Sequence, residues 1–117
     1  MPPTSQPVAL ITGGSSGIGL ELAKQFAQHG YRLILVARDQ VKLDAAADTL
    51  KALHADAQIK TINVDLATEQ GGQEAYARAQ ETGWTVDVLC NNAGYGVYGD
   101  FATGTLLAEE LKMIHVN

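Results

Sequence analysis

Residues 12–19 read Thr-Gly-Gly-Ser-Ser-Gly-Ile-Gly, and this glycine-rich segment carries the strongest structural signal in the chain. It follows an apolar run, residues 8–11, and precedes a segment with the apolar spacing of a helix. Glycines let the backbone bend sharply and approach an anion without a Cβ in the way. A helix that begins at such a turn offers unpaired N–H groups and the positive end of its dipole. The stretch therefore predicts the first strand, turn and helix of a dinucleotide-binding sheet.

The rest of the chain continues this alternation of strands and helices. Nearly continuous apolar runs such as residues 32–37 are typical of parallel strands that are covered on both faces. Asp39 is expected to cap the second helix, and Gly30 to end the first. The predicted strands span residues 8–12, 32–37, 58–63 and 86–90; the predicted helices span 16 or 17 to 29, a segment after 39, 68–81, and a segment from 105.

This pattern predicts an α/β fold with one parallel sheet and crossover helices. Residues 1–7 are expected to form a flexible tail, and residues 8–117 a dinucleotide-binding domain. The helix from residue 105 would carry an apolar stripe of Leu107, Leu111 and Ile114.

Composition excludes several classes of protein. The 117 residues carry a net charge of −5, which argues against nucleic acid as a partner. The single cysteine, Cys90, excludes an internal disulfide and favours a reducing compartment, so the cytoplasm is expected. No apolar run is long enough to span a bilayer, and no membrane partner is expected. The spacing of histidine, cysteine and carboxylate residues suggests no metal site.

A second motif, Asn91-Asn92-Ala93-Gly94, follows the fourth predicted strand. Together with Thr12-Gly-x-x-x-Gly-x-Gly19 it resembles the short-chain dehydrogenase/reductase family, and the resemblance runs from Val8 to Asn117. The three residues between Gly13 and Gly17 resemble the compact members of that family. The resemblance implies a Rossmann-type doubly wound sheet of strand order 3-2-1-4, with the cofactor at the carboxyl ends of strands one and four.

The resemblance also implies which residues contact the cofactor. Ser16 could instead be a plain helix cap, and Asp65 could cap the third helix. Asn91 would brace the strands, and Asn92 is expected to be structural. The expected cofactor-binding residues are Gly13, Ser15, Ser16, Gly17, Ile18 and Gly19 at the pyrophosphate, Asp65 and Leu66 at the adenine, and Asn91, Ala93 and Gly94 near the ribose groups.

The end of the second strand indicates which nicotinamide cofactor is bound. An acidic residue about twenty positions after the turn would hold the ribose 2′-hydroxyl of NAD(H). That position is Ala37, and Arg38 follows it. Because a guanidinium can pair with a 2′-phosphate, the sequence predicts NADP(H) rather than NAD(H), with Arg38 as the main contact. The alternative is that Arg38 is solvated and Asp39 binds the ribose.

By resemblance, the family transfers a hydride between nicotinamide and a carbonyl or alcohol carbon. A tyrosine four residues before a lysine moves the proton, a serine orients the carbonyl, and an asparagine supports a water. No tyrosine here precedes a lysine at that spacing, and the serines lie only in the tail and the turn. Asn117 matches the catalytic asparagine.

We therefore expect the N-terminal portion of an NADP(H)-dependent oxidoreductase, inactive alone, whose longer parent acts on a small carbonyl or alcohol substrate. The alternatives are a catalytically silent NADP(H)-binding module and a half-enzyme completed by a second chain. Residues 86–90 would then form an apolar sheet edge, which predicts a homo-oligomer or a complementing chain. Cys90 is expected to be a small buried residue, because no base lies beside it in the sequence.

Overall fold

The alternation of strands and helices predicted from the apolar runs is present in the structure. The computed structural model describes residues 6–15, 17–66, 68–92 and 112–115. The elements in this part of the chain are β1 (Val8–Thr12), α1 (Gly17–Gln28), β2 (Arg32–Ala37), α2 (Gln40–Leu53), β3 (Ile59–Asn63), α3 (Glu69–Glu81), β4 (Val88–Asn91) and β5 (Lys112–His115).

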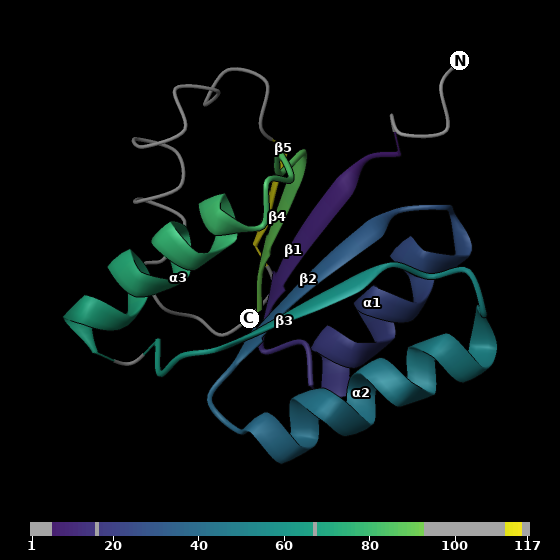
Figure 1. Cartoon of the computed structure of the whole chain (residues 1–117), viewed down its shortest axis with the longest axis horizontal. Helices are drawn as coiled ribbons and strands as arrows, with labels where there is room; N and C mark the ends of the chain where they lie inside the picture. The colour runs from purple at the N-terminus through teal and green to yellow at the C-terminus, as the bar shows by residue number, and fades with distance from the viewer. Residues whose placement is uncertain (1–5, 16, 67, 93–111, 116–117) are drawn as a thin grey trace.

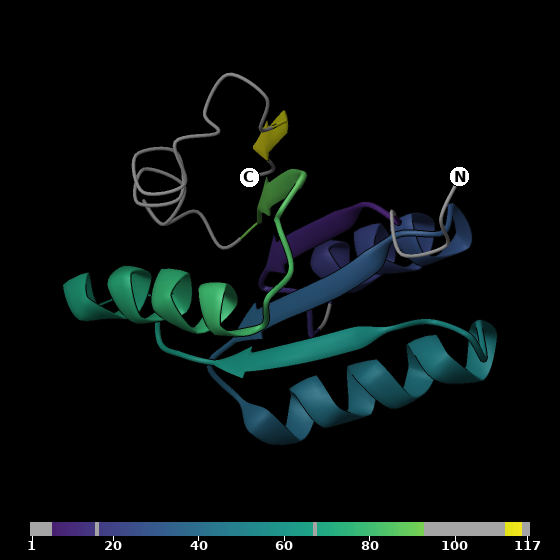
Figure 2. The ribbon, with the colours of Figure 1, turned by 45° about the horizontal axis from the view of Figure 1, so that its top comes forward.

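All the described strands belong to one sheet in the order β3-β2-β1-β4-β5, and every neighbouring pair is parallel. Leu10 in the central strand lies opposite Ile34 of β2 and Leu89 of β4. Figure 2 shows β1, β2 and β3 running in the same direction. The predicted α/β class and the strand order 3-2-1-4 are therefore confirmed, and β5 extends the sheet beyond β4.

The sheet is covered on both faces, so the molecule has three layers (Figure 1). Helix α3 lies on one face, and helices α1 and α2 lie on the other. Successive residues of β1 point to opposite faces: Val8 and Leu10 pack with α3, whereas Ala9 and Ile11 pack with α1 and α2. All five residues of β1 are buried, which explains why its sequence is apolar without alternation.

The helix boundaries follow the local signals in the sequence. The Asp39 carboxylate accepts a hydrogen bond from the Lys42 backbone N–H at 3.2 Å, so Asp39 is the N-cap of α2 as predicted. After α1, the Tyr31 N–H donates to the Phe26 carbonyl at 3.0 Å and Gly30 has a φ of 84°. This arrangement satisfies carbonyls at the end of α1 and confirms Gly30 as its stop.

Four elements differ slightly from the sequence prediction at their ends, and the first is α1, which ends at Gln28 rather than residue 29. Strand β3 begins at Ile59 rather than residue 58, and Thr68 is the N-cap of α3 rather than its first residue. Strand β4 covers Val88–Asn91 rather than residues 86–90. Its start is marked by Asp87, whose carboxylate accepts a hydrogen bond from the Val8 N–H at 2.9 Å.

The prediction of a helix from residue 105 is wrong for residues 112–115, which are the part of that segment that the structure describes. Lys112–His115 forms β5, with Met113 opposite Leu89 and Ile114 opposite Cys90. Residues 105–111, including Leu107 and Leu111, lie outside the described residues. A short apolar run fits helix and strand spacing equally well. Pairing with the open side of β4 satisfies backbone groups that a helix at this position would leave unpaired.

The predicted apolar edge at residues 86–90 is also wrong. Strand β4 pairs with β1 on one side and with β5 on the other, so it is internal to the sheet. Leu89 is buried against the α3 face, and Val88 against the face covered by α1 and α2. The argument for self-association through a bare β4 is therefore lost.

Candidate functional site

The turn between β1 and α1 is held close to the end of β2. The Gly13 N–H donates a hydrogen bond to the Val36 carbonyl at 2.8 Å. Gly13 and Gly17 have φ values of 66° and 58°, in the left-handed region that side chains disfavour. The chain therefore reverses at the carboxyl ends of the strands and enters α1 there.

Gly19, in the first turn of α1, lies too close to the glycine turn to carry a side chain. A Cβ built at Gly19 would collide with the Gly13 carbonyl oxygen and lie 2.9 Å from the Asn92 side-chain nitrogen. The first turn of α1 thus rests directly on the backbone of the glycine turn. A Cβ at Gly17 would meet nothing within 4 Å, so the start of α1 is open on its outer side.

These features fit the phosphates of a dinucleotide. The first turn of α1 carries no acidic side chain that would compete for the N–H groups of the helix start. The open side at Gly17 leaves room for an anion at the positive end of the helix dipole. Ser15 is half-buried beside the turn, and Ser16 lies outside the described residues.

A buried polar network joins the turn to the end of β4. The Thr12 hydroxyl donates to the Asn91 side-chain oxygen at 3.2 Å, and it accepts a hydrogen bond from the Asn92 N–H at 2.9 Å. The Asn92 side-chain amide donates to the Gly13 carbonyl at 3.3 Å. Thr12 and Asn91 are almost completely buried. Both asparagines therefore fix the relative position of β1, β4 and the glycine turn.

A cavity of about 210 Å³ opens at the carboxyl ends of β1, β2 and β3. Four of the predicted cofactor residues line it: Gly13, Arg38, Asp65 and Leu66. They lie far apart in the sequence and meet because the carboxyl ends of parallel strands share one edge of the sheet. The walls of the cavity are completed by Val36, Ala37 and Val64.

Arg38 is exposed at this cavity, and in the described part of the chain no carboxylate forms an ion pair with it. The neighbouring Asp39 is occupied as the cap of α2. Of the two residues, Arg38 lines the cavity and Asp39 does not.

Asp65 lines the cavity, and it is not the cap of α3. The Thr68 hydroxyl has that role, because it accepts a hydrogen bond from the Gly71 N–H at 3.0 Å. The same hydroxyl donates to the Asp65 carbonyl at 3.0 Å. The alternative interpretation of Asp65 as a helix cap is therefore wrong.

Sequence reasoning missed the contribution of Gly71. A Cβ at this position would collide with the Asp65 carbonyl oxygen and lie 2.9 Å from the Thr68 hydroxyl oxygen. The close approach holds the start of α3 against the backbone of Asp65. The pair Gly71-Gly72, which weakens a helix by its propensity, was the available signal.

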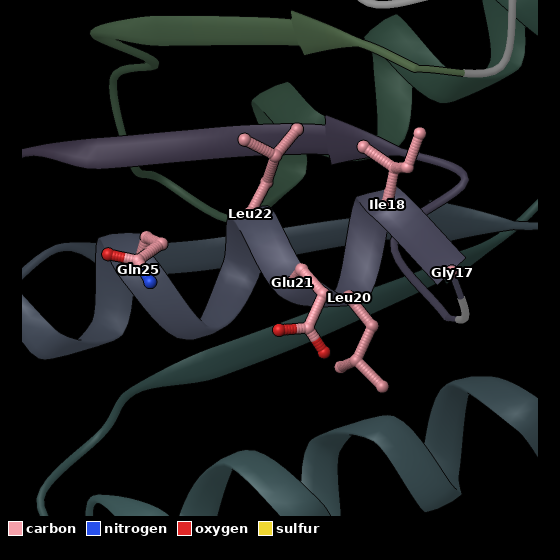
Figure 3. A pocket seen from close by; sticks show the side chains of 6 residues that line it. All are labelled: Gly17, Ile18, Leu20, Glu21, Leu22 and Gln25. Carbon is pink, nitrogen blue, oxygen red and sulfur yellow. The ribbon is translucent and has the colours of Figure 1, made fainter.

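A second hollow, of about 500 Å³, runs along the outer side of α1. Figure 3 shows Ile18 and Leu22 pointing to the same side of the helix, while Leu20 points to the side of α2. Ile18 is 56% exposed, which is high for a large apolar side chain. Because the hollow begins at Gly17, it adjoins the open start of α1.

Cys90 is buried among the apolar residues between the sheet and helices α1 and α2. This burial raises the pKa of its thiol to about 11. A thiol that stays protonated at neutral pH is a poor nucleophile. The prediction of a small buried residue is confirmed.

Several predicted site residues cannot be placed. Ala93, Gly94 and Asn117 lie outside the described residues, as does Ser16. In the described ranges, no three histidine, cysteine or carboxylate residues gather as they would around a metal ion. No helix within those ranges has the length and apolar character needed to cross a membrane.

The parallel sheet with a glycine turn at the start of α1 defines a dinucleotide-binding α/β fold. Residues 7–117 match the short chain dehydrogenase family, and the chain belongs to that family. Among curated relatives, the uncharacterized oxidoreductase YvaG of Bacillus subtilis is 38% identical over 86 residues, which cover 74% of this chain and 31% of YvaG.

Solved structures also include similar reductases. L-sorbose reductase from Gluconobacter frateurii, in complex with NADPH and L-sorbose, is 40% identical with a TM-score of 0.71, over 79% of this chain and 35% of that one. The RhlG–NADP complex of Pseudomonas aeruginosa is 33% identical with a TM-score of 0.69, over 80% of this chain and 37% of RhlG. The chain thus spans about a third of the length of these relatives.

Proposed function

We propose that this chain forms the NADP(H)-binding portion of a short-chain oxidoreductase that reduces a carbonyl or oxidises an alcohol. The observation that carries the proposal is the cavity at the ends of β1, β2 and β3, which joins the glycine turn to an arginine that has no ion pair to the described residues. A neutral residue, Ala37, stands where an NAD(H)-binding member would carry a carboxylate.

Each group of residues is assigned to a different part of the cofactor. The Arg38 guanidinium would pair with the 2′-phosphate, while Asp65 and Leu66 would contact the adenine in the same cavity. Asn91 would hold the strands in register beneath the ribose groups. The remaining contacts would come from Gly13, Ser15, Ser16, Gly17, Ile18 and Gly19 at the pyrophosphate and from Ala93 and Gly94 along the riboses.

Two similar proteins support the choice of cofactor. The sorbose reductase was solved with NADPH and RhlG with NADP, and both exceed 30% identity to this chain. The nicotinamide, when bound, donates or accepts the hydride of the reaction. Asn117 is the one residue of this sequence that we assign to catalysis, by its match to the family motif.

Binding and turnover should separate in this chain. The sequence contains no tyrosine four residues before a lysine, so it lacks the phenol that the family uses to move the proton. We therefore expect cofactor binding without turnover when the chain is assayed alone with NADPH and a panel of ketones. Turnover that copurifies with the chain would contradict this part of the proposal.

Calorimetric titration of the full chain tests the cofactor assignment. Adenosine 2′,5′-bisphosphate and NADPH should bind more tightly than adenosine 5′-monophosphate and NADH. Arg38→Ala should weaken the two 2′-phosphorylated ligands about 10- to 100-fold, because it removes charged hydrogen bonds, and should leave the other two nearly unchanged.

Arg32→Ala is the matched control. Arg32 is an arginine on the same strand, at the opposite end, where its guanidinium donates to the Gln6 carbonyl at 2.7 Å. It should leave all four affinities unchanged. The assignment fails if Arg38→Ala binds NADPH as tightly as the wild type does.

A further inference from the structure

Three consecutive carbonyls at the end of β2 are each held by a different partner. The Val36 carbonyl accepts from the Gly13 N–H at 2.8 Å, and the Ala37 carbonyl accepts from the Val64 N–H at 3.0 Å. The Arg38 carbonyl accepts from the side-chain amide of Asn63 at 2.8 Å. The Asn63 side chain thus supplies the donor for a carbonyl that lies just beyond the last backbone hydrogen bond between β2 and the segment after β3.

Asn63 is itself held in place by α3, the helix that covers one face of the sheet. It is the last residue of β3 and lies opposite Ala37. Its own carbonyl accepts a hydrogen bond from the Arg78 guanidinium of α3 at 2.8 Å. Arg78 also reaches Glu74, one turn earlier on α3, at 3.4 Å. Asn63 therefore connects α3, through β3, to the turn that follows β2.

Arg38 lies between two fixed points of the backbone. On one side Asn63 holds the Arg38 carbonyl, and on the other side Asp39 is fixed as the cap of α2. These hydrogen bonds restrain the backbone angles around Arg38, and a side chain leaves the backbone in a direction that those angles set. The direction is the one in which Arg38 borders the cavity.

We propose that Asn63 is a positioning residue for Arg38 and thereby a determinant of the preference for a 2′-phosphorylated adenosine cofactor. The inference rests on the proposed function, since it assigns to Asn63 the orientation of the guanidinium that binds the 2′-phosphate. Asn63 does not line the cavity, so its effect on the ligand passes through Arg38. Arg78 supports the same arrangement one step further away.

The test compares two ligands that differ only in the 2′-phosphate. Affinities of adenosine 2′,5′-bisphosphate and adenosine 5′-monophosphate are measured by calorimetry for the wild-type chain and for Asn63→Ala. Loss of one positioning hydrogen bond should lower the ratio of the two affinities about three- to tenfold. Affinity for the monophosphate should change little.

A purely structural role for Asn63 would weaken both ligands together and leave the ratio unchanged. The double variant Arg38→Ala/Asn63→Ala separates the two roles further, because Asn63→Ala should have no effect on the ratio once the guanidinium is gone. Thr61→Ala is the matched control, since Thr61 lies two residues earlier on β3 and does not line the cavity. If Asn63→Ala fails to fold, Asn63→Ser and Arg78→Met take its place, each lowering the ratio.

An unchanged ratio in folded Asn63 variants would overturn the inference while leaving Arg38 as the phosphate ligand. So would a full effect of Asn63→Ala in the Arg38→Ala background. A wild-type chain that binds both adenosines equally would instead overturn the proposed cofactor assignment, and with it the role of Asn63.

Discussion

The two ends of β2 use an arginine in opposite ways. At the amino end, the Arg32 guanidinium lies 4.9 Å from the centre of the Trp84 ring, and the Lys60 ammonium lies at the same distance. Arg32 also donates to the Gln6 carbonyl. At the carboxyl end, Arg38 is exposed beside a cavity with no ion pair to the described residues. The fold thus supplies partners for the Arg32 guanidinium, whereas the Arg38 guanidinium forms no ion pair with the described residues.

The glycines at the two edges of the sheet also differ in what surrounds them. Close backbone approaches at Gly19 and Gly71 pack the starts of α1 and α3 against the strand ends. At the amino edge, Gly30 and Gly83 have positive φ angles but no atom near the position of a Cβ. Gly19 and Gly71 at the carboxyl edge are therefore required by contact, whereas Gly30 and Gly83 at the amino edge, like Gly17 at the carboxyl edge, are required by backbone conformation.

Gly19→Ala should give the largest effect. The new Cβ would overlap the Gly13 carbonyl, so the start of α1 must shift, at a cost of roughly 3 kcal/mol in the free energy of unfolding. Binding of adenosine 2′,5′-bisphosphate and NADPH should fall at least tenfold, because the phosphate turn moves with the helix. Chemical denaturation and calorimetry measure the two effects.

Gly30→Ala is its control at the amino edge. The φ of 84° makes alanine unfavourable there by about 1–2 kcal/mol, but no contact is created. Stability should fall while ligand affinity in the folded fraction stays at the wild-type value. Equal loss of affinity in both variants would contradict the distinction between the two edges.

Gly71→Ala should have a smaller effect of the same kind. Alanine gains about 1 kcal/mol in helix propensity, yet a Cβ here collides with the Asp65 carbonyl, at a cost of about 2 kcal/mol. The net loss of stability should come with severalfold weaker binding of both adenosine ligands, measured by calorimetry. Ala77→Gly, on the exposed side of the same helix, should lose about 1 kcal/mol without any change in affinity. A stabilised Gly71→Ala would show that the close approach relaxes at no cost.

The pH dependence linked to Cys90 should be the smallest effect, and it concerns the interior between the two edges. Burial raises the pKa of the Cys90 thiol to about 11 in the folded chain, whereas the pKa of a cysteine in an unfolded chain is about 8.5. Between these values the unfolded chain has released a proton that the folded chain keeps, so stability falls as pH rises. Denaturation curves at pH 7 to 10 should therefore converge for the wild type and a less stable Cys90→Ala variant. Parallel pH profiles for the two proteins would contradict this assignment.

Local sequence signals were sufficient to predict much of this structure. The order of strands and helices, the cap at Asp39 and the end of α1 at Gly30 follow from patterns within a few residues. The cavity-lining residues Gly13, Arg38, Asp65 and Leu66 came from motif positions together with the rule that parallel strands end at one edge.

The features that could not be predicted depend on contacts between distant segments. Strand β5 is too short for its apolar pattern to distinguish a strand from a helix. Only its pairing with β4 shows that this segment is a strand. Asn63 reads as an ordinary polar residue at a strand end until the Arg38 carbonyl is found beside its amide. Gly71 reads as a weakness of α3, because its collision partner Asp65 is visible only in three dimensions.

The complete burial of β1 has a consequence for hydrogen exchange. β1 lies between β2 and β4, and each of its residues is shielded on both faces of the sheet. Amide protons of Leu10 and Ile11 should therefore exchange with solvent only when the whole domain opens. A ligand bound at the edge would slow their exchange through mass action alone, so these two amides would report its affinity without touching it.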